Sequence, residues 1–269
     1  HVDRSIDNPE SFISTNIFGT YSLINSAYEY WKNLNSKKGD AFKFVMVSTD
    51  EVYGSLGLKD KKFSEDNPYL PNSPYAASKA SSDLLSRSWH KTYKFPVIIT
   101  NTSNNYGPWQ FPEKLIPLTI NKCIRREKIP IYGSGSQIRD WIHVQDHVDG
   151  LIYISKKGKL GHKYNIGANN EIKNINVVKN ICDIFDKLNA NQKKTSRELI
   201  SFVDDRPGHD KRYAINTKKI NKLGWRSKIK WHQGLEETVK WYLSNKNYLN
   251  QINKNSYSGK RLGVIKKRK

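Results

Sequence analysis

Residues 42–48 read FKFVMVS, and residues 96–102 read PVIITNT. Each is a short, continuous apolar run, which is typical of a strand buried on both faces of a parallel sheet. Apolar residues recur every three to four positions over Pro9–Leu34, and Ser73-Pro74 opens a second helical stretch over Tyr75–Tyr93. Strands that alternate with helices in this way predict an α/β fold of the doubly wound type, with a parallel sheet and right-handed crossovers.

The pattern changes after residues 106–108 (YGP). Prolines become more frequent, and amphipathic helices are indicated over Asn174–Asn189 and Gln233–Ser244. This half of the chain predicts a smaller, mixed α/β domain. We therefore expect one domain over 1–107, a second over 108–250 with some segments that return to the first, and a basic, loosely ordered tail over 251–269.

Composition limits the function classes. With 36% hydrophobic residues among 269, the chain is expected to fold rather than remain disordered. No apolar run approaches the roughly 20 residues that span a bilayer, so we expect no membrane segment. The net charge of +21 permits a polyanion-binding protein, but the lysines are scattered outside residues 260–269 and no nucleic-acid motif accompanies them. A lysine-rich, solvated surface explains the charge more simply.

The candidate metal ligands are few. Cys123 and Cys182 stand far apart in the sequence, within apolar stretches and outside any CxxC motif, which favours two buried free thiols in a reducing cytoplasm. His143 and His147 have the spacing of one helix face but lack a visible third ligand. The sequence therefore predicts no metal site.

Tyr75 and Lys79 form a YxxxK pair. On a helix these positions share a face, and an ammonium beside a phenol is expected to lower the pKa of the phenol from its ordinary value near 10. Tyr75 then becomes a candidate general base toward a hydroxyl group. The alternative is an ordinary helix pair, but the motif follows a strand that ends in Ser48-Thr49, where an α/β sheet places its ligand.

Residues 48–54 read STDEVYG and lie at the carboxyl end of the first predicted strand. Here Thr49 offers a hydroxyl that orients a substrate, while Asp50 and Glu51 offer an acid and a base. Adjacent carboxylates repel, so one of their pKa values is expected to rise and leave a proton donor beside an acceptor. A helix cap or a solvated turn is the alternative for these residue types.

Seven blocks carry a family resemblance: STDEVYG (48–54), SPYAASKASSD (73–83), TNTSNNYGPWQFPEKLIPL (100–118), IYGSGSQIRDWIHVQDH (131–147), YNIGANNE (164–171), DRPGHDKRYAIN (205–216) and YSGKRLG (257–263). In this order they resemble dTDP-glucose 4,6-dehydratases of the extended short-chain dehydrogenase/reductase family. HVDRS at residues 1–5 resembles the block that follows the third strand of those enzymes. The Asp-Glu pair favours a dehydratase over an epimerase, and DRPGHD favours the thymidine-nucleotide branch over the GDP-mannose branch.

The resemblance implies a lyase that uses NAD. Tyr75 would take the proton of the glucose 4-hydroxyl while Thr49 holds that hydroxyl, and Lys79 would bind the nicotinamide ribose. The 4-ketone then acidifies the C5 proton, which Glu51 would remove. A protonated Asp50 would donate to the leaving 6-hydroxyl, and hydride would return to C6.

The resemblance also implies binding groups. NAD would contact Thr15, Tyr75, Lys79 and Asn105. The nucleotide-sugar would contact Thr49, Asn104, Lys114, Leu115, Pro130, Ile131, Tyr132, Arg139, Asn174, Asp205, Arg206, Pro207, Gly208 and His209. Arginines suit the diphosphate because a guanidinium binds phosphate oxygens in a bidentate manner. Arg139 and Asp140 could instead form a structural ion pair, and Gly133–Gly135 indicates mainly a turn.

One family feature is absent from the sequence. No glycine-rich dinucleotide turn occurs in the opening residues, so we expect a partial Rossmann-type sheet whose first βαβ segment, roughly 60–80 residues, is missing. On that basis the chain alone is expected neither to bind NAD tightly nor to dehydrate dTDP-glucose. An inactive nucleotide-sugar-binding remnant, or another nucleotide-sugar dehydratase or epimerase, stays open as an alternative. The resemblance further implies a homodimer through the helices at Pro9–Leu34 and Tyr75–Tyr93.

Overall fold

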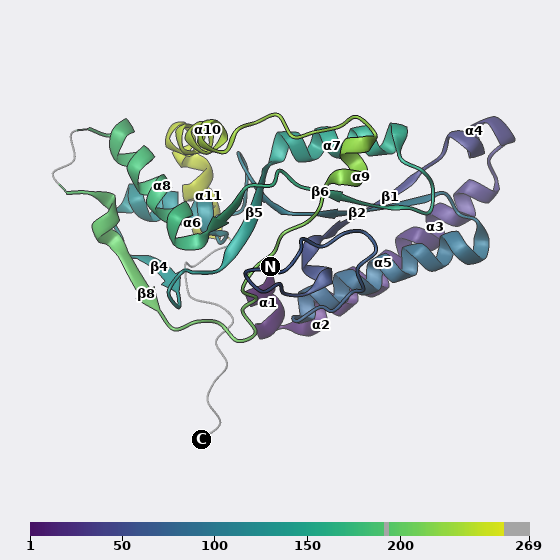
Figure 1. The fold of residues 1–269 in the computed structure, drawn as a ribbon, viewed down its shortest axis with the longest axis horizontal. Coiled ribbons are helices and arrows are strands. Elements are labelled where there is room, and N and C mark those ends of the chain that lie inside the picture. The colour runs from purple at the N-terminus through teal and green to yellow at the C-terminus, as the bar shows by residue number, and fades with distance from the viewer. Residues whose placement is uncertain (191–193, 256–269) are drawn as a thin grey trace, which may run out of the picture.

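A computed structural model describes residues 1–190 and 194–255 (Figure 1). In it, the predicted motifs meet on a sheet of three parallel strands. They are β1 (Phe44–Thr49), β2 (Val97–Thr102) and β6 (Lys163–Ile166), in the order β1-β2-β6. The register aligns Thr49 with Thr102 and Thr102 with Ile166, so the three carboxyl ends meet at one edge. Every residue of β2 is buried, as its continuous apolar run predicts.

The second predicted helix is confirmed as α5 (Pro74–Tyr93). Its N-terminus is fixed by Ser73, whose side chain accepts a hydrogen bond from the Ala76 N–H, and by Pro74 in the first turn. The helix ends where Lys94 takes a left-handed conformation, with φ of 59°. These local signals explain why both ends were readable from the sequence.

The first predicted helix consists of three consecutive helical segments, α2 (Pro9–Phe12), a π-helical segment η1 (Ile13–Phe18) and α3 (Gly19–Lys32). It ends two residues before the predicted end. The π-helical segment contacts α5, because the Asn16 side chain donates to Ser78 Oγ and the Ser82 hydroxyl donates to the Asn16 carbonyl. Periodicity predicted a helix here but could not distinguish its π-helical turn.

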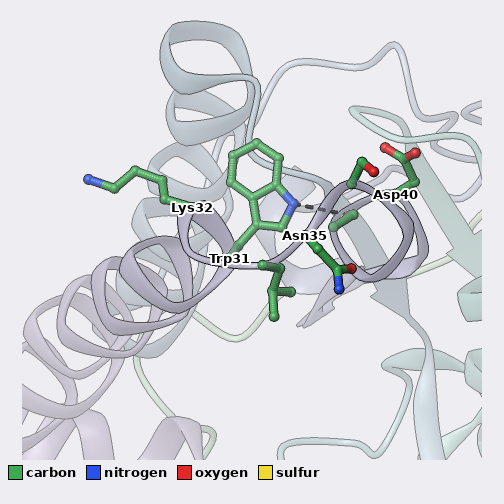
Figure 2. A pocket seen from close by; sticks show the side chains of 7 residues that line it. Trp31, Lys32, Asn35 and Asp40 are labelled. Atoms are coloured by element: carbon green, nitrogen blue, oxygen red, sulfur yellow. Dashed lines mark hydrogen bonds between the residues drawn. The ribbon is translucent and has the colours of Figure 1, made fainter.

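A short helix, α4 (Ser36–Ala41), follows α3 and packs back on its end. The Trp31 indole N–H donates to the Gly39 carbonyl at 3.1 Å, and the two helix ends enclose a cavity of about 340 Å³ (Figure 2). This cavity lies beside α4, at the opposite end of the molecule from α6 (Leu115–Arg125) and α8 (Asn174–Leu188) (Figure 1). None of the residues predicted for function lines it.

The second half of the chain packs around its own core. Its strands are β3 (Asn104–Tyr106), β4 (Ile129–Tyr132), β5 (Ile138–His143), β7 (Glu171–Lys173) and β8 (Ile200–Val203). Parallel and antiparallel pairs both occur, since β3 pairs with β5 in parallel and β5 with β7 in antiparallel fashion. Helices α6 (Leu115–Arg125), α8 (Asn174–Leu188) and α10 (Trp231–Ser244) contribute most of the buried side chains of this core.

The two cysteines meet in this core. Cys123 of α6 and Cys182 of α8 are both buried and free, and a hydrogen bond joins their thiols. That bond and burial raise the pKa of Cys182 above its ordinary value, so the thiol stays protonated. The prediction of buried free thiols is confirmed, whereas their proximity was not visible from sequence spacing.

The remaining elements are α1 (Val2–Asp7), η2 (Asp50–Tyr53), α7 (Val144–Lys157), η3 (Ser196–Leu199), α9 (Lys218–Lys222) and α11 (Lys246–Asn255). The prediction of loose order from about Asn250 is wrong for residues 251–255, which continue α11. The rest of the predicted tail, including YSGKRLG, lies outside the described residues. Among the described helices, none is long and apolar enough to cross a membrane.

Candidate active site

A cavity of about 380 Å³ opens at the carboxyl end of β1, within the size range of ligand sites. Its wall combines α1, the β1–η2 junction, the start of α5 and the segment after β2 with β4, β5 and the loop after β8. The structure therefore brings together most of the predicted site residues: Thr49, Asp50, Glu51, Tyr75, Asn104, Asn105, Lys114, Leu115, Pro130, Ile131, Tyr132, Arg139, Asn174, Arg206 and His209.

Thr49, Asp50 and Glu51 occupy the turn from β1 into η2. The Thr49 hydroxyl accepts a hydrogen bond from the Glu51 N–H at 3.2 Å, which fixes the start of this short helix. Asp50 is only 2% exposed. Burial, and then the neighbouring Glu51 charge, raise the pKa of Asp50 well above its ordinary value. The expected rise of one carboxyl pKa is confirmed, and it leaves Asp50 able to donate a proton.

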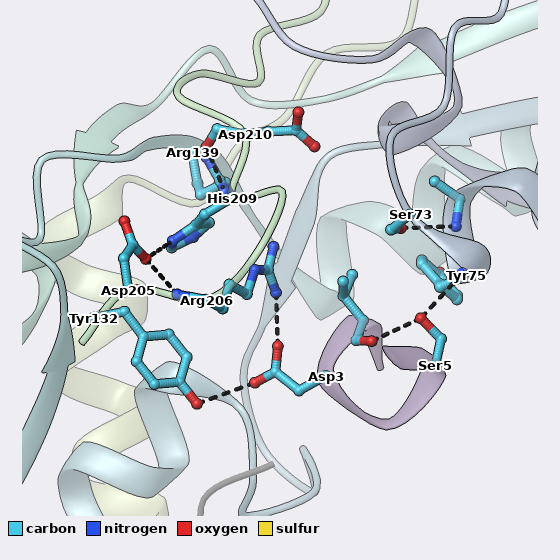
Figure 3. Close-up of polar contacts among 12 residues, drawn as sticks. Asp3, Ser5, Ser73, Tyr75, Tyr132, Arg139, Asp205, Arg206, His209 and Asp210 are labelled. Carbon is cyan, nitrogen blue, oxygen red and sulfur yellow. Dashed lines mark hydrogen bonds and ion pairs between the residues drawn. The ribbon is translucent and has the colours of Figure 1, made fainter. Parts of the chain in front are cut away.

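Tyr75, in the first turn of α5, lines the same cavity. Its backbone N–H donates a hydrogen bond to Ser5 Oγ at 3.1 Å (Figure 3). The prediction that its pKa is lowered is wrong for this structure. Burial raises the pKa of the Tyr75 phenol, and the nearby Glu51 and Asp50 raise it further. A hydrogen bond with Thr49 lowers the same pKa but does not offset these effects. Low solvation and the nearby Glu51 carboxylate therefore keep the phenol protonated.

The position of Lys79 explains part of the difference between the predicted fall and the actual rise of the Tyr75 pKa. Its ammonium does not line the cavity but donates to the Val47 carbonyl at 2.8 Å, on the outer side of β1. Burial lowers the pKa of Lys79, while the charge of Asp83 raises it. Lys79 thus lies one turn from Tyr75 on α5, as predicted, but makes its described hydrogen bond to the backbone.

Several other predicted residues also lie outside the cavity wall. Thr15 is exposed in the π-helical segment. Pro207 and Gly208 belong to the loop but do not line the cavity. Asp205 stabilises that loop through its carboxylate, which forms a hydrogen bond with His209 Nδ1 at 2.5 Å and accepts one from Gln137 Nε2 at 2.8 Å.

Arg139 belongs to β5 and is buried in the cavity wall. Its guanidinium donates to the carbonyls of Ile138 and Asp210, and it stacks 4.1 Å from the centre of the Tyr213 ring. The alternative of an Arg139–Asp140 ion pair is wrong, because Asp140 instead accepts a hydrogen bond from the Asn170 N–H at 2.7 Å. Arg139 is thus held in place without a carboxylate partner among the described residues.

Two residues missed by the sequence analysis shape this end of the site. Asp3 of α1 bonds Arg206 at 2.9 Å and accepts from the Tyr132 hydroxyl at 3.1 Å (Figure 3). Tyr213 packs on Arg139 and donates to Asp210. Both residues lie within quoted blocks, HVDRS and DRPGHDKRYAIN, but nothing in those letters showed what they contact.

The comparisons with known proteins indicate the family of this chain. The family described as GDP-mannose 4,6 dehydratase matches residues 1–238. A dTDP-glucose 4,6-dehydratase of Shigella flexneri is 50% identical over 96% of this chain and 73% of its own length. The Xanthomonas campestris enzyme of the same name is 49% identical over 98% of this chain and 76% of its own length.

Solved structures add the fold. A dTDP-glucose 4,6-dehydratase from Streptomyces venezuelae, with NAD and TYD bound, superposes with a TM-score of 0.82 at 38% identity, over 92% of this chain and 71% of that one. The Bacillus anthracis enzyme in complex with NAD gives 0.76 at 44% identity, over 87% and 70%. The sheet is therefore of the Rossmann type found in these enzymes, and the chain belongs to the dTDP-glucose 4,6-dehydratase family.

Proposed function

We propose that this protein is a dTDP-glucose 4,6-dehydratase, a lyase that converts dTDP-glucose to dTDP-4-keto-6-deoxyglucose. The observation that carries the proposal is the grouping of a buried, proton-bearing Asp50 with Glu51 and Tyr75 at one end of a cavity. The buried Arg139 lines the same cavity, within range of the charges of Asp50 and Glu51. A dehydration needs an acid, a base and a hydroxyl-activating group together, and the arginines suit a diphosphate.

The cofactor we propose is NAD, which supplies a hydride acceptor and donor when bound. The residues at the edge of β1 and β3 fit its nicotinamide end. Asn105 Oδ1 is buried at the cavity and has no hydrogen-bond partner within the described part of the chain. We assign Asn105, Tyr75 and Lys79 to this end, with Thr15 nearby on the adjoining helix.

Tyr75 and Thr49 act on the sugar 4-hydroxyl in this proposal. Thr49 holds the hydroxyl, and Tyr75 receives its proton as C4 is oxidised. Since the pKa of Tyr75 is raised by burial and by Glu51 and Asp50, the phenol needs a cation to reach its basic form. We assign this role to Lys79, one turn along the same helix face, whose ammonium would have to leave the Val47 carbonyl to act on the phenol.

Glu51 and Asp50 then carry out the elimination. The C4 ketone makes the C5 proton acidic, and Glu51 removes it. Asp50 gives its proton to the 6-hydroxyl, so the C6–O bond breaks and one water leaves. Glu51 then returns its proton to C5 while C6 receives the hydride taken from C4, which bound NAD would hold in the interval. Burial of Asp50 serves this step, because it keeps the acid protonated until the leaving group requires the proton.

The nucleotide end is assigned to Arg139, Arg206 and their neighbours. Arg139 is already oriented by Tyr213 and by two backbone carbonyls, so little conformational freedom is lost when it binds a phosphate. Arg206 is held by Asp3, and a diphosphate would share or replace that carboxylate. The two buried thiols fit a cytoplasmic protein.

We also propose a homodimer through α3 and α5. Large apolar side chains are exposed on both helices: Phe18, at the junction with α3, is 66% exposed, Leu23 62% and Leu84 55%. Such a group marks an interaction surface. A Leu84→Asp variant of a dimeric protein should elute as a monomer in size-exclusion chromatography with light scattering, and an unchanged dimer would place the interface elsewhere.

The test is to incubate the full-length protein with NAD and with dTDP-glucose, UDP-glucose or GDP-mannose, and to follow the sugar by NMR. We expect loss of the C6 hydroxyl and formation of a 4-keto product from dTDP-glucose only. Inversion at C4 without loss of water would indicate an epimerase. No turnover of any donor would indicate a nucleotide-sugar-binding protein without activity.

A further inference from the structure

A buried polar cluster lies beside the catalytic strand end but outside the cavity wall. It consists of Asp83 of α5, Asn101 of β2, Asn165 of β6 and the phenols of Tyr53 and Tyr69. None of these residues lines the active-site cavity. Since buried polar groups cost free energy unless they are bonded, such a cluster beside a catalytic centre calls for a specific role.

Asp83 is the charged member of this cluster and is only 1% exposed. Its Oδ2 accepts hydrogen bonds from Asn101 Nδ2 and from the Tyr69 hydroxyl, each at 2.9 Å. Asn101 Nδ2 also donates to the Thr49 carbonyl at 3.2 Å. Asp83 therefore reaches the backbone of Thr49 through one intervening amide group.

Asp83 also shares a helix face with the residues proposed to act on the 4-hydroxyl. Tyr75, Lys79 and Asp83 follow one another at intervals of four residues along α5. Lys79 has its hydrogen bond to the Val47 carbonyl and no carboxylate within ion-pair distance in the described structure. Asp83 supplies the opposite charge that favours the ammonium form of Lys79.

Resting on the roles proposed for Thr49 and Lys79, we propose that Asp83 is a positioning residue. It fixes the Thr49 end of β1 through Asn101 and keeps Lys79 a cation from the next turn of α5. Asp83 does not touch the substrate cavity, so it acts only through these two residues.

The charges around Asp83 determine how the role depends on pH. Facing it are Lys79 and Tyr75 of α5, Lys163 of β6 and the phenols of Tyr53 and Tyr69. Across a separate cavity of about 490 Å³ lie Glu65 and Asp66. Burial raises the pKa of Asp83 to about 6, while hydrogen bonds and Lys79 lower it. Asp83 is thus charged at neutral pH, where Lys79 is needed as a cation.

The first test measures the pKa of Lys79 without any substrate. Competitive amine labelling across a pH series, read by peptide mass spectrometry, reports when the Lys79 ammonium loses its proton. In the full-length protein, Asp83→Asn should lower that pKa by about one unit, because an opposing charge is removed while the side-chain shape is kept. Asp83→Glu should restore part of the shift. Asp66→Asn, which removes an exposed charge from the same cavity, should leave Lys79 unchanged.

The second test is kinetic. Asp83→Asn should lower kcat for dTDP-glucose by about tenfold or more and move the alkaline limb of the rate profile to lower pH, with KM within about twofold. An unchanged Lys79 pKa overturns the proposal, and so does a lowered pKa with an unchanged kcat. A parent protein that fails to dehydrate dTDP-glucose refutes the proposed function instead, and the labelling result then still decides whether Asp83 controls Lys79.

Discussion

The active-site cavity has two sides that hold their residues in different ways. On one side, Thr49, Asp50 and Glu51 are consecutive residues at the end of a buried strand, and Tyr75 stands in the first turn of a long helix. On the other side, Arg206 belongs to a loop and is held by Asp3, which is 203 residues away in the chain. Regular elements fix the first side, whereas on the second side the loop that carries Arg206 is fixed by a long-range side-chain contact.

This difference separates chemistry from binding. Groups that transfer protons must keep a fixed geometry, and a strand end and a helix provide it. A loop held by a few ion pairs and hydrogen bonds can open for a large nucleotide and close on it. Substitutions on the first side should therefore change turnover, whereas those on the second should change affinity and loop stability.

The largest expected effect is on the catalytic side. Tyr75→Phe removes the hydroxyl proposed as general base and keeps the ring that packs edge-on against Phe12. Turnover of dTDP-glucose should fall by about 10²- to 10⁴-fold with little change in nucleotide-sugar affinity, measured by steady-state kinetics and calorimetry. A matching loss of affinity would mean that Tyr75 binds substrate, and the contrast between the two sides would fail.

Arg139→Ala tests the binding side. It should weaken nucleotide-sugar binding by about 2–3 kcal/mol, because charge-assisted hydrogen bonds are lost, and should leave NAD affinity unchanged. Arg197→Ala is the matched control, since Arg197 pairs with Asp183 at an exposed position remote from the cavity. Equal effects of the two substitutions in a calorimetric titration would show that Arg139 has only a structural role.

His209 gives the loop side a pH dependence. Burial, and then Arg206, lower the pKa of His209 to about 4 from its ordinary value near 6.5. The unfolded chain therefore binds a proton more readily, and stability is lost as pH falls from about 6.5 toward 4. Urea unfolding at pH 6.5 and at pH 5 gives the free energy of unfolding at each pH. Between these two values the parent should lose about 1–2 kcal/mol more than His209→Gln. Identical losses would exclude His209 as the source.

Asp3→Asn should have the smallest effect. It removes the charge that holds Arg206 but keeps a side chain of similar shape for the Tyr132 hydroxyl. We expect the free energy of unfolding to fall by about 1 kcal/mol, read from thermal melts. Asp183→Asn, which breaks the exposed ion pair with Arg197, should lower the free energy of unfolding by less. A larger loss in the control would remove the distinction between the buried pair and a surface pair.

The catalytic side could be predicted because its information is local. The apolar runs gave both strands, Ser73-Pro74 gave the start of α5, and STDEVYG placed Asp50 and Glu51 at a strand end. The direction of the Asp50 pKa shift could be expected from its adjacency to Glu51, whereas burial, its larger cause, depends on packing. These features depend on neighbours in the sequence or one helical turn away.

The rest depended on packing between distant segments. The raised pKa of Tyr75 results from burial by several elements, and the orientation of Lys79 depends on where the Val47 carbonyl lies. The stacking of Tyr213 on Arg139 and the meeting of two cysteines across α6 and α8 join residues far apart in the chain. Periodicity and spacing carry no signal for such contacts.

The most direct test of the account is the Glu51→Gln variant of the full-length, NAD-loaded protein, followed by the ultraviolet absorbance of NADH after mixing with dTDP-glucose. Glu51 lies on the catalytic side and is proposed only for the removal and return of the C5 proton. The account predicts that oxidation at C4 proceeds, that NADH accumulates on the protein in near-stoichiometric amount, and that no water is lost. Turnover at the parent rate, or no NADH at all, would contradict the division of labour between Tyr75 and Glu51.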